Sequence, residues 1–127
     1  MDKPKVLIID DEQDLCKLFE RILTDDGYSV ITAYNGIDGI KRNEEHHPDI
    51  IILDLKMPKI DGIETLRNIR KTDKDVIVIV LTGYGSVETI RNSVDLNVYE
   101  YISKPFNTDV IKKVIKEAFD SKVIKNE

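Results

Sequence analysis

The chain has 127 residues and a formal net charge of −5, with 41% hydrophobic and 34% charged residues. This length corresponds to about one domain of roughly 100–200 residues, and the composition excludes a disordered or a membrane protein. No apolar run approaches the ~20 residues of a membrane helix, and the first residues lack the apolar region of a signal peptide, so we expect a cytoplasmic protein. A single cysteine excludes an internal disulfide, and the lack of a basic tract argues against direct nucleic-acid binding.

Apolar runs alternate along the chain with segments of helical periodicity, a pattern that separates strands from helix faces. Strands are expected at Val6–Ile9, Val30–Ala33, Ile50–Leu53, Val76–Leu81 and Tyr99–Ile102. Helices are expected around Leu15, Leu18, Phe19, Ile22 and Leu23, from Asn35 to about Glu45, around Ile63, Leu66 and Ile69, and around Val87, Ile90 and Val94. A last helix is expected with an apolar face made by Val110, Ile111, Val114, Ile115, Ala118 and Phe119. Gly27 and Asn97 are suited to end the first and the fourth of these helices.

Five strands alternating with five helices predict an α/β domain, a doubly wound parallel sheet with helices on both faces. The first, third and fourth strands are apolar throughout, which is typical of strands buried on both faces. The second strand alternates and the fifth contains Glu100, so both are expected at the edges. The flavodoxin-like strand order 2-1-3-4-5 meets these conditions with right-handed crossovers.

Charged and polar residues follow the ends of the expected strands. Asp10 and Asp11 follow the first strand and Asp54 follows the third. Because ligands of open parallel sheets bind beyond the carboxyl ends of the strands where the winding reverses, these acids are expected to converge on one pocket. Clustered carboxylates need protons or a cation, and Mg²⁺ suits two or three of them. With Lys104 after the fifth strand and Thr82 after the fourth, the set can stabilise a phosphoryl group in transfer.

Other kinds of phosphate chemistry fit the same positions poorly. No glycine-rich loop follows the first strand, which argues against a nucleotide-binding site, and three acids would repel the phosphate of a flavodoxin-like cofactor. The acids are contiguous at Asp10-Asp11, whereas haloacid-dehalogenase-type phosphatases require Asp-x-Asp. An Asp carboxylate is itself a known covalent phosphate acceptor.

Four short motifs occur in order at the ends of the expected strands: Ile9-Asp10-Asp11-Glu12, Leu53-Asp54-Leu55-Lys56-Met57-Pro58 with Asp61-Gly62, Leu81-Thr82-Gly83, and Tyr101-Ile102-Ser103-Lys104-Pro105-Phe106. Together they resemble the receiver domain of bacterial two-component response regulators, the CheY-like family. The resemblance covers roughly residues 5–122 and implies a single receiver domain over residues 1–127.

This resemblance implies that Asp54 accepts a phosphoryl group from the phosphohistidine of a sensor histidine kinase or a phosphotransfer protein. Asp10, Asp11, Asp54 and the backbone carbonyl of Lys56 would hold Mg²⁺. The implied function is a phosphorylation-controlled signalling switch, not an enzyme that acts on an outside substrate. Asp11 taken alone is more typical of a helix cap.

The resemblance also implies roles on the far side of the phosphoryl group. Lys104 and Thr82 would bind its oxygens, and Tyr101 would turn inward behind Thr82, which would change the surface of the fourth helix, fifth strand and fifth helix. Taken alone, Tyr101 is equally typical of an ordinary edge-strand aromatic residue. Pro58 and Gly62 would be structural, and Lys104-Pro105 would be a cis peptide.

Some positions bear on the lifetime of the phosphorylated state. Lys56 lies two residues after Asp54, and Gly83 and Tyr84 follow Thr82. We hypothesise that the side chains of Lys56 and Tyr84 obstruct attacking water and slow spontaneous dephosphorylation. One departure from the family pattern is Asn97-Val98, where Gly-Ala is usual.

Two other functions remain open from the sequence. One is a pseudo-receiver, which binds partners without phosphate, and the other is a small Mg²⁺-dependent phosphatase. The sequence leaves the effector domain or protein unknown, allows a phosphorylation-dependent homodimer, and does not distinguish a stand-alone regulator from a fragment of a longer protein.

Overall fold

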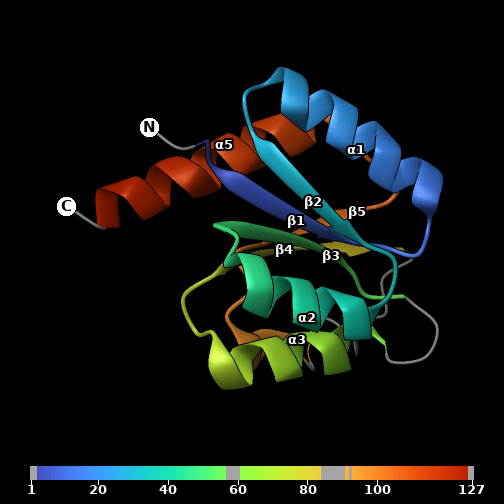
Figure 1. Cartoon of the computed structure of the whole chain (residues 1–127), viewed down its shortest axis with the longest axis vertical. Coiled ribbons are helices and arrows are strands. Elements are labelled where there is room, and N and C mark those ends of the chain that lie inside the picture. The colour runs from blue at the N-terminus through green and yellow to red at the C-terminus, as the bar shows by residue number, and fades with distance from the viewer. Residues whose placement is uncertain (1–2, 57–60, 84–90, 92, 126–127) are drawn as a thin grey trace.

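The computed structural model describes residues 3–56, 61–83, 91 and 93–125 (Figure 1). The strands within these residues are β1 (Lys5–Ile9), β2 (Ser29–Ala33), β3 (Ile50–Asp54), β4 (Ile77–Thr82) and β5 (Glu100–Ser103). The helices are α1 (Gln13–Asp25), α2 (Gly36–His46), α3 (Gly62–Thr72) and α5 (Thr108–Lys125), with a short 3-10 turn, η1 (Val94–Leu96). Among them no helix is long and apolar enough to cross a membrane.

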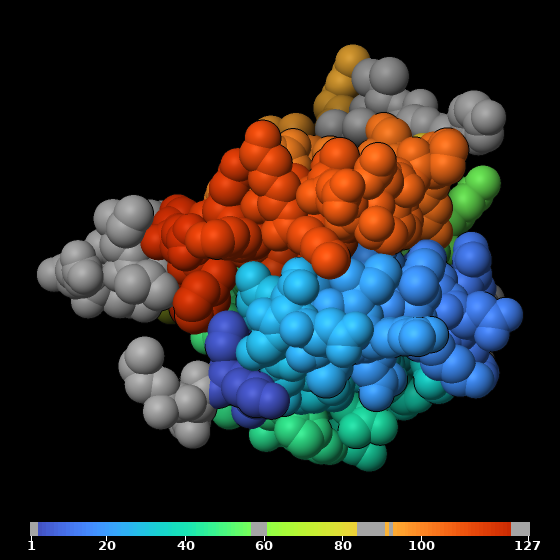
Figure 2. All heavy atoms as spheres, turned by 90° about the horizontal axis from the view of Figure 1, so that it is seen from above, coloured from blue at the N-terminus to red at the C-terminus, as the bar shows by residue number. Residues whose placement is uncertain are grey.

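The five strands form one parallel sheet in the order β2-β1-β3-β4-β5, which confirms the order expected from the sequence. The helices α2 and α3 lie on one face of the sheet and α1 and α5 on the other (Figure 1). Seen from above in Figure 2, α1 (blue) and α5 (orange to red) lie side by side. An ion pair between Asp26 and Lys112, 3.7 Å long, links the end of α1 to α5.

Burial explains the strand order. The side chains of β3 are all buried and those of β1 and β4 nearly all, whereas β2 is half-buried and β5 is exposed at both of its ends. Strands covered on both faces are apolar along nearly their whole length, so the three apolar strands take the centre of the sheet. Successive side chains of each strand point to opposite faces of the sheet. They therefore form two separate core layers, one under α1 and α5 and one under α2 and α3.

The ends of the first two helices follow local backbone rules. Gly27 has a φ of 93° just after α1, a left-handed conformation in which glycine carries no steric cost. The side-chain oxygen of Asn35 accepts a hydrogen bond of 2.8 Å from the backbone N–H of Asp38, and so caps α2 as expected. Gly39 packs so closely on β1 that a Cβ would lie 2.5 Å from Cδ1 of Ile9.

Three residues predicted to be buried on helix faces are exposed. Leu18 is 46% exposed because α1 turns Cys16, Phe19 and Leu23 to the core, so Leu18 lies at the edge of the buried face of the helix. Val110 is 47% exposed in the first turn of α5, because the buried face of this helix begins with the next residue. Val94 lies in η1 and is 69% exposed.

The remainder of the fourth predicted helix, marked by Val87 and Ile90, lies outside the described residues. Its expected end is present, since Asn97 has a φ of 57° in the left-handed region. Asparagine tolerates this conformation better than most residues.

Candidate functional site

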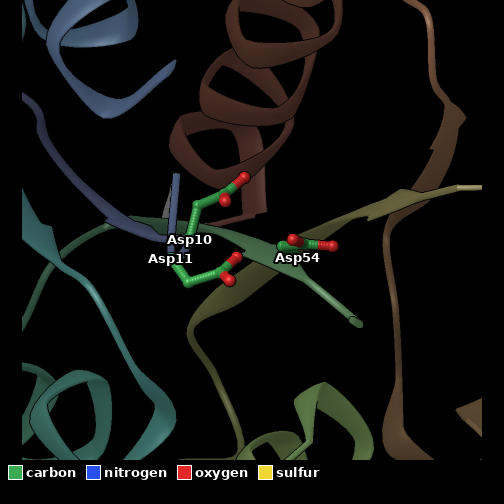
Figure 3. Close-up of side chains that lie close together, drawn as sticks. All are labelled: Asp10, Asp11 and Asp54. Carbon is green, nitrogen blue, oxygen red and sulfur yellow. The ribbon is translucent and has the colours of Figure 1, made fainter. Parts of the chain in front are cut away.

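The carboxylates of Asp10, Asp11 and Asp54 meet at the carboxyl ends of β1 and β3. The two strands pair with Ile9 opposite Leu53, so the acids that follow come to the same edge of the sheet. One oxygen from each of the three side chains lies within 4.8 Å of the others, and Figure 3 shows the three side chains together. Asp10 and Asp54 are buried, at 0% and 3% exposure, whereas Asp11 faces solvent. The predicted convergence of the three acids is confirmed.

Asp10 and Asp54 are held in the same way by the chain that follows them. Oδ1 of Asp10 accepts a hydrogen bond of 2.9 Å from the backbone N–H of Glu12, and Oδ1 of Asp54 accepts one of 3.0 Å from that of Lys56. Aspartates adopt this local turn readily because the side chain imitates a backbone carbonyl. Each carboxylate is therefore fixed through one oxygen and presents its other oxygen, Oδ2, to the site.

The ammonium group of Lys104 lies between these free oxygens. Its Nζ is 3.4 Å from Oδ2 of Asp54, 3.6 Å from Oδ2 of Asp10 and 3.8 Å from Oε1 of Glu12. Burial lowers the pKa of Lys104, but attraction to the three carboxylates outweighs it, so the pKa is raised overall and the group stays charged. Lys104 thus supplies a permanent positive charge beside Asp54.

The backbone brings Lys104 next to Thr82. Thr82 ends β4 opposite Ser103 of β5, and the backbone N–H of Lys104 donates a hydrogen bond of 2.7 Å to the carbonyl of Thr82. The Lys104-Pro105 peptide is cis, as the family resemblance implied. Thr82 is 6% exposed and stands at the same sheet edge as the acids.

The charge balance of the site favours a cation. Burial, together with the nearby negative charge of Asp54, raises the pKa of Asp10 to about 6. The hydrogen bond from the backbone N–H of Glu12 lowers the pKa, but it offsets only part of this rise. Oδ2 of Asp10 is buried without a hydrogen-bond partner. A hard divalent ion with oxygen ligands fits this group of two buried carboxylates and one exposed carboxylate. It would also give the buried Oδ2 of Asp10 a partner.

The two glycines of the site motifs, Gly62 and Gly83, have different amounts of space around them. At Gly62 a Cβ would lie 2.3 Å from Cα of Leu55 and 2.5 Å from the carbonyl oxygen of Asp54, so α3 approaches β3 closely only without a side chain there. At Gly83 a Cβ would meet no described atom within 4 Å. Pro58 and Tyr84 lie outside the described residues, and their roles stay predictions.

Tyr101 is partly buried and packs against the core layer under α2 and α3. Its hydroxyl forms a hydrogen bond of 2.5 Å with Oγ of Ser93, which has no exposed surface. Ser93 and Glu12 are absent from the residues singled out above as site residues. Glu12 belongs to the first motif and could have been included, but a serine in a polar segment gives no signal of a buried partner.

Comparisons with known proteins agree with this geometry. Residues 6–116 match the family described as the response regulator receiver domain. The chain is 32% identical to sporulation initiation phosphotransferase F of Bacillus subtilis (strain 168), over 92% of this chain and 94% of that protein. A CheY-like response regulator receiver domain protein from Methanospirillum hungatei JF-1 has a crystal structure that matches with a TM-score of 0.94 at 28% identity, over 98% and 99% of the two chains. The chain therefore belongs to the response regulator receiver domain family.

Other relatives are longer than this chain. It is 28% identical to regulatory protein AtoC of Escherichia coli (strain K12) over 97% of its own length, but spans only 27% of AtoC. It spans about half the length of two further curated relatives, both transcriptional regulators. As a receiver domain the chain is a regulatory module, a phosphoacceptor switch of two-component signalling.

Proposed function

We propose that Asp54 is the residue that accepts the phosphoryl group, and that the donor is the phosphohistidine of a sensor histidine kinase or of a phosphotransfer protein. Oδ2 of Asp54 attacks phosphorus, the P–N bond breaks, the imidazole leaves with a proton from water, and an acyl phosphate remains. The observation that carries this proposal is the position of Asp54: buried, held through Oδ1, and 3.4 Å from the ammonium of Lys104 through Oδ2.

Asp10, Asp11 and Asp54 would hold Mg²⁺, with the backbone carbonyl of Lys56 as a further ligand. The unsatisfied Oδ2 of Asp10 supports this assignment. When bound, the ion neutralises the carboxylates and the incoming phosphoryl oxygens. Asp11, which is exposed, can reach such an ion directly or through water.

Lys104 and Thr82 would bind the phosphoryl oxygens, and Tyr101 would carry the change outward. Val80 pairs with Tyr101 and Thr82 pairs with Ser103, so Tyr101 and Thr82 lie on the same face of neighbouring strands. A movement of Thr82 toward Asp54 changes the space behind it, which Tyr101 can enter. The surface of the segment between β4 and β5, of β5 itself and of α5 would change in consequence. Charge-assisted hydrogen bonds of about 1.5–3 kcal/mol each suffice to shift such an equilibrium.

Further residues of the motifs would control the acyl phosphate or support the fold around it. Lys56 and Tyr84, with Gly83 beside them, would set the lifetime of the acyl phosphate, and Pro58, Gly62 and Pro105 would be structural. We place the protein in the cytoplasm as one receiver domain over residues 1–127. It binds a kinase or phosphotransfer protein and an effector, with a phosphorylation-dependent homodimer as a further state, and does not itself bind nucleic acid.

Incubation with acetyl phosphate and Mg²⁺, followed by intact-mass measurement, tests the proposal. The wild-type chain should gain one phosphoryl group, which base or hydroxylamine removes, while Asp54→Asn should gain none. Asp14→Asn, an acid in the first turn of α1 outside the cluster, serves as the matched control and should behave as wild type. No phosphoryl gain would instead indicate a pseudo-receiver, and repeated turnover of acetyl phosphate through an unmodified Asp54 would indicate a phosphatase.

A further inference from the structure

A hydrogen bond joins the segment before β5 to the strand itself. Oγ of Ser93 and the hydroxyl of Tyr101 are 2.5 Å apart, and Ser93 is fully buried. A tyrosine hydroxyl that reaches a buried partner must be turned toward the protein interior, because the same ring turned outward would place its hydroxyl in solvent. The bond therefore exists only in the inward orientation of Tyr101.

Hydrogen bonds from Arg70 attach the chain after Ser93 to the core. The turn that follows Ser93, η1, is bound to α3 by Arg70, a residue that is only 9% exposed. Its guanidinium donates hydrogen bonds to the carbonyls of Leu96 (2.8 Å) and Asn97 (2.9 Å), and also to that of Val76 (2.7 Å) at the start of the β4 segment. One buried cation thus fixes the chain after Ser93 to two other parts of the core.

Tyr101 is also connected to the site. It shares a face of the sheet with Thr82 on the adjacent strand, and the backbone N–H of Lys104, three residues further along the same chain, donates to Thr82. A movement of Thr82 toward Asp54 therefore changes the space on this face into which the Tyr101 ring turns.

We infer that Ser93 is a positioning residue that holds Tyr101 inward and thereby favours the conformation of the site that binds the phosphoryl group. This inference rests on the proposed function, in which the inward orientation of Tyr101 accompanies phosphorylation. Since coupling between two positions is reciprocal, loss of the Ser93–Tyr101 bond must weaken binding at Asp54.

Beryllofluoride, a stable mimic of the phosphoryl group, is the probe, with Mg²⁺ present and affinity measured by titration. Ser93→Ala and Tyr101→Phe remove the same bond from opposite sides. Each should weaken beryllofluoride binding about two- to tenfold, the range expected for one hydrogen bond. The double variant should lose less affinity than the two single losses combined, because the bond that they share can be lost only once. Thr72→Ala removes a hydroxyl bonded to the carbonyl of Ile69 in α3 and should leave the affinity unchanged.

A second measurement needs neither Mg²⁺ nor beryllofluoride. Fluorotyrosine NMR, with the Tyr101 signal assigned by its loss in Tyr101→Phe, reports the orientation of the ring among the five tyrosines of the chain. The Tyr101 signal should shift toward the solvent-exposed position in Ser93→Ala and stay in place in Thr72→Ala.

The outcomes separate the two proposals. If wild type binds beryllofluoride and Ser93→Ala binds it equally or more tightly, the role of Ser93 is refuted. An unchanged Tyr101 signal in Ser93→Ala, or an equal loss of affinity in Thr72→Ala, refutes it as well. If wild type itself fails to bind beryllofluoride with Mg²⁺, the proposed function fails, while the NMR measurement still decides whether Ser93 holds the ring.

Discussion

Lys104 and Asp54 form the central charge pair of the site, with Nζ and Oδ2 separated by 3.4 Å. The two residues are fifty positions apart in the sequence, and both stand at the end of a parallel strand. The side chain of Lys104 is 23% exposed and that of Asp54 is 4% exposed, so solvent screens their attraction only partly.

Replacement of Lys104 by Met should slow phosphorylation of Asp54 by acetyl phosphate about tenfold or more, because a preorganised positive charge at the transferring group is lost. Lys104→Arg keeps the charge but not the compact ammonium, and should retain part of the rate. The initial rate at saturating Mg²⁺ is the measurement. Equal rates for wild type and Lys104→Met would contradict the assigned role.

Asp10→Asn should stabilise the protein in buffer without Mg²⁺. The pKa of Asp10 is raised from 3.8 to about 6 by burial, so the folded state binds its proton more tightly than the unfolded state does. This favours folding at low pH, and the benefit is lost as the pH rises from 3.8 to about 6. At neutral pH the uncharged Asn should therefore add about 2–3 kcal/mol to the free energy of unfolding.

Urea unfolding with a chelator present measures this difference. The gain of Asp10→Asn over wild type should shrink toward pH 3.8 and should reverse when Mg²⁺ is added, because wild type gains the binding energy of the ion. Asp14→Asn, in the first turn of α1, is the control without a buried carboxylate. A variant less stable than wild type at neutral pH without Mg²⁺ would show that ionised Asp10 stabilises the fold.

Gly62→Ala should destabilise the domain by about 1–3 kcal/mol, because the added Cβ would overlap the backbone at Leu55 and Asp54. Gly83→Ala, at the other glycine of the site motifs, should change the free energy of unfolding by no more than about 0.5 kcal/mol, because its Cβ meets no described atom. Thermal unfolding of the two variants measures the contrast, and equal losses would contradict it.

Replacement of both Lys56 and Tyr84 by Ala should shorten the lifetime of the acyl phosphate. Lys56 is exposed and follows Asp54 by two residues, where its side chain can block water that attacks phosphorus. Release of phosphate from the phosphorylated protein, followed after removal of acetyl phosphate, gives the rate. Lys74→Ala, an exposed lysine before β4, is the control. Unchanged or substantially slower release in the double variant would refute the hypothesis.

The sequence by itself determined the sheet and the acidic pocket. Five apolar runs, three of them without a polar residue, predict which strands lie at the centre and which at the edges, because a strand covered on both faces is apolar along nearly its whole length. Once that order is known, residues at strand ends such as Asp10, Asp54 and Lys104 must meet at one edge, since parallel strands share a direction.

Only the tertiary structure decided the contacts that depend on how helices are rotated and how side chains turn. The exposure of Leu18, the reach of Arg70 to the turn at Leu96 and the bond between Ser93 and Tyr101 have no periodic signature in the chain. Each depends on a few degrees of helix rotation or on one choice of rotamer, and packing with residues distant in sequence selects among these choices.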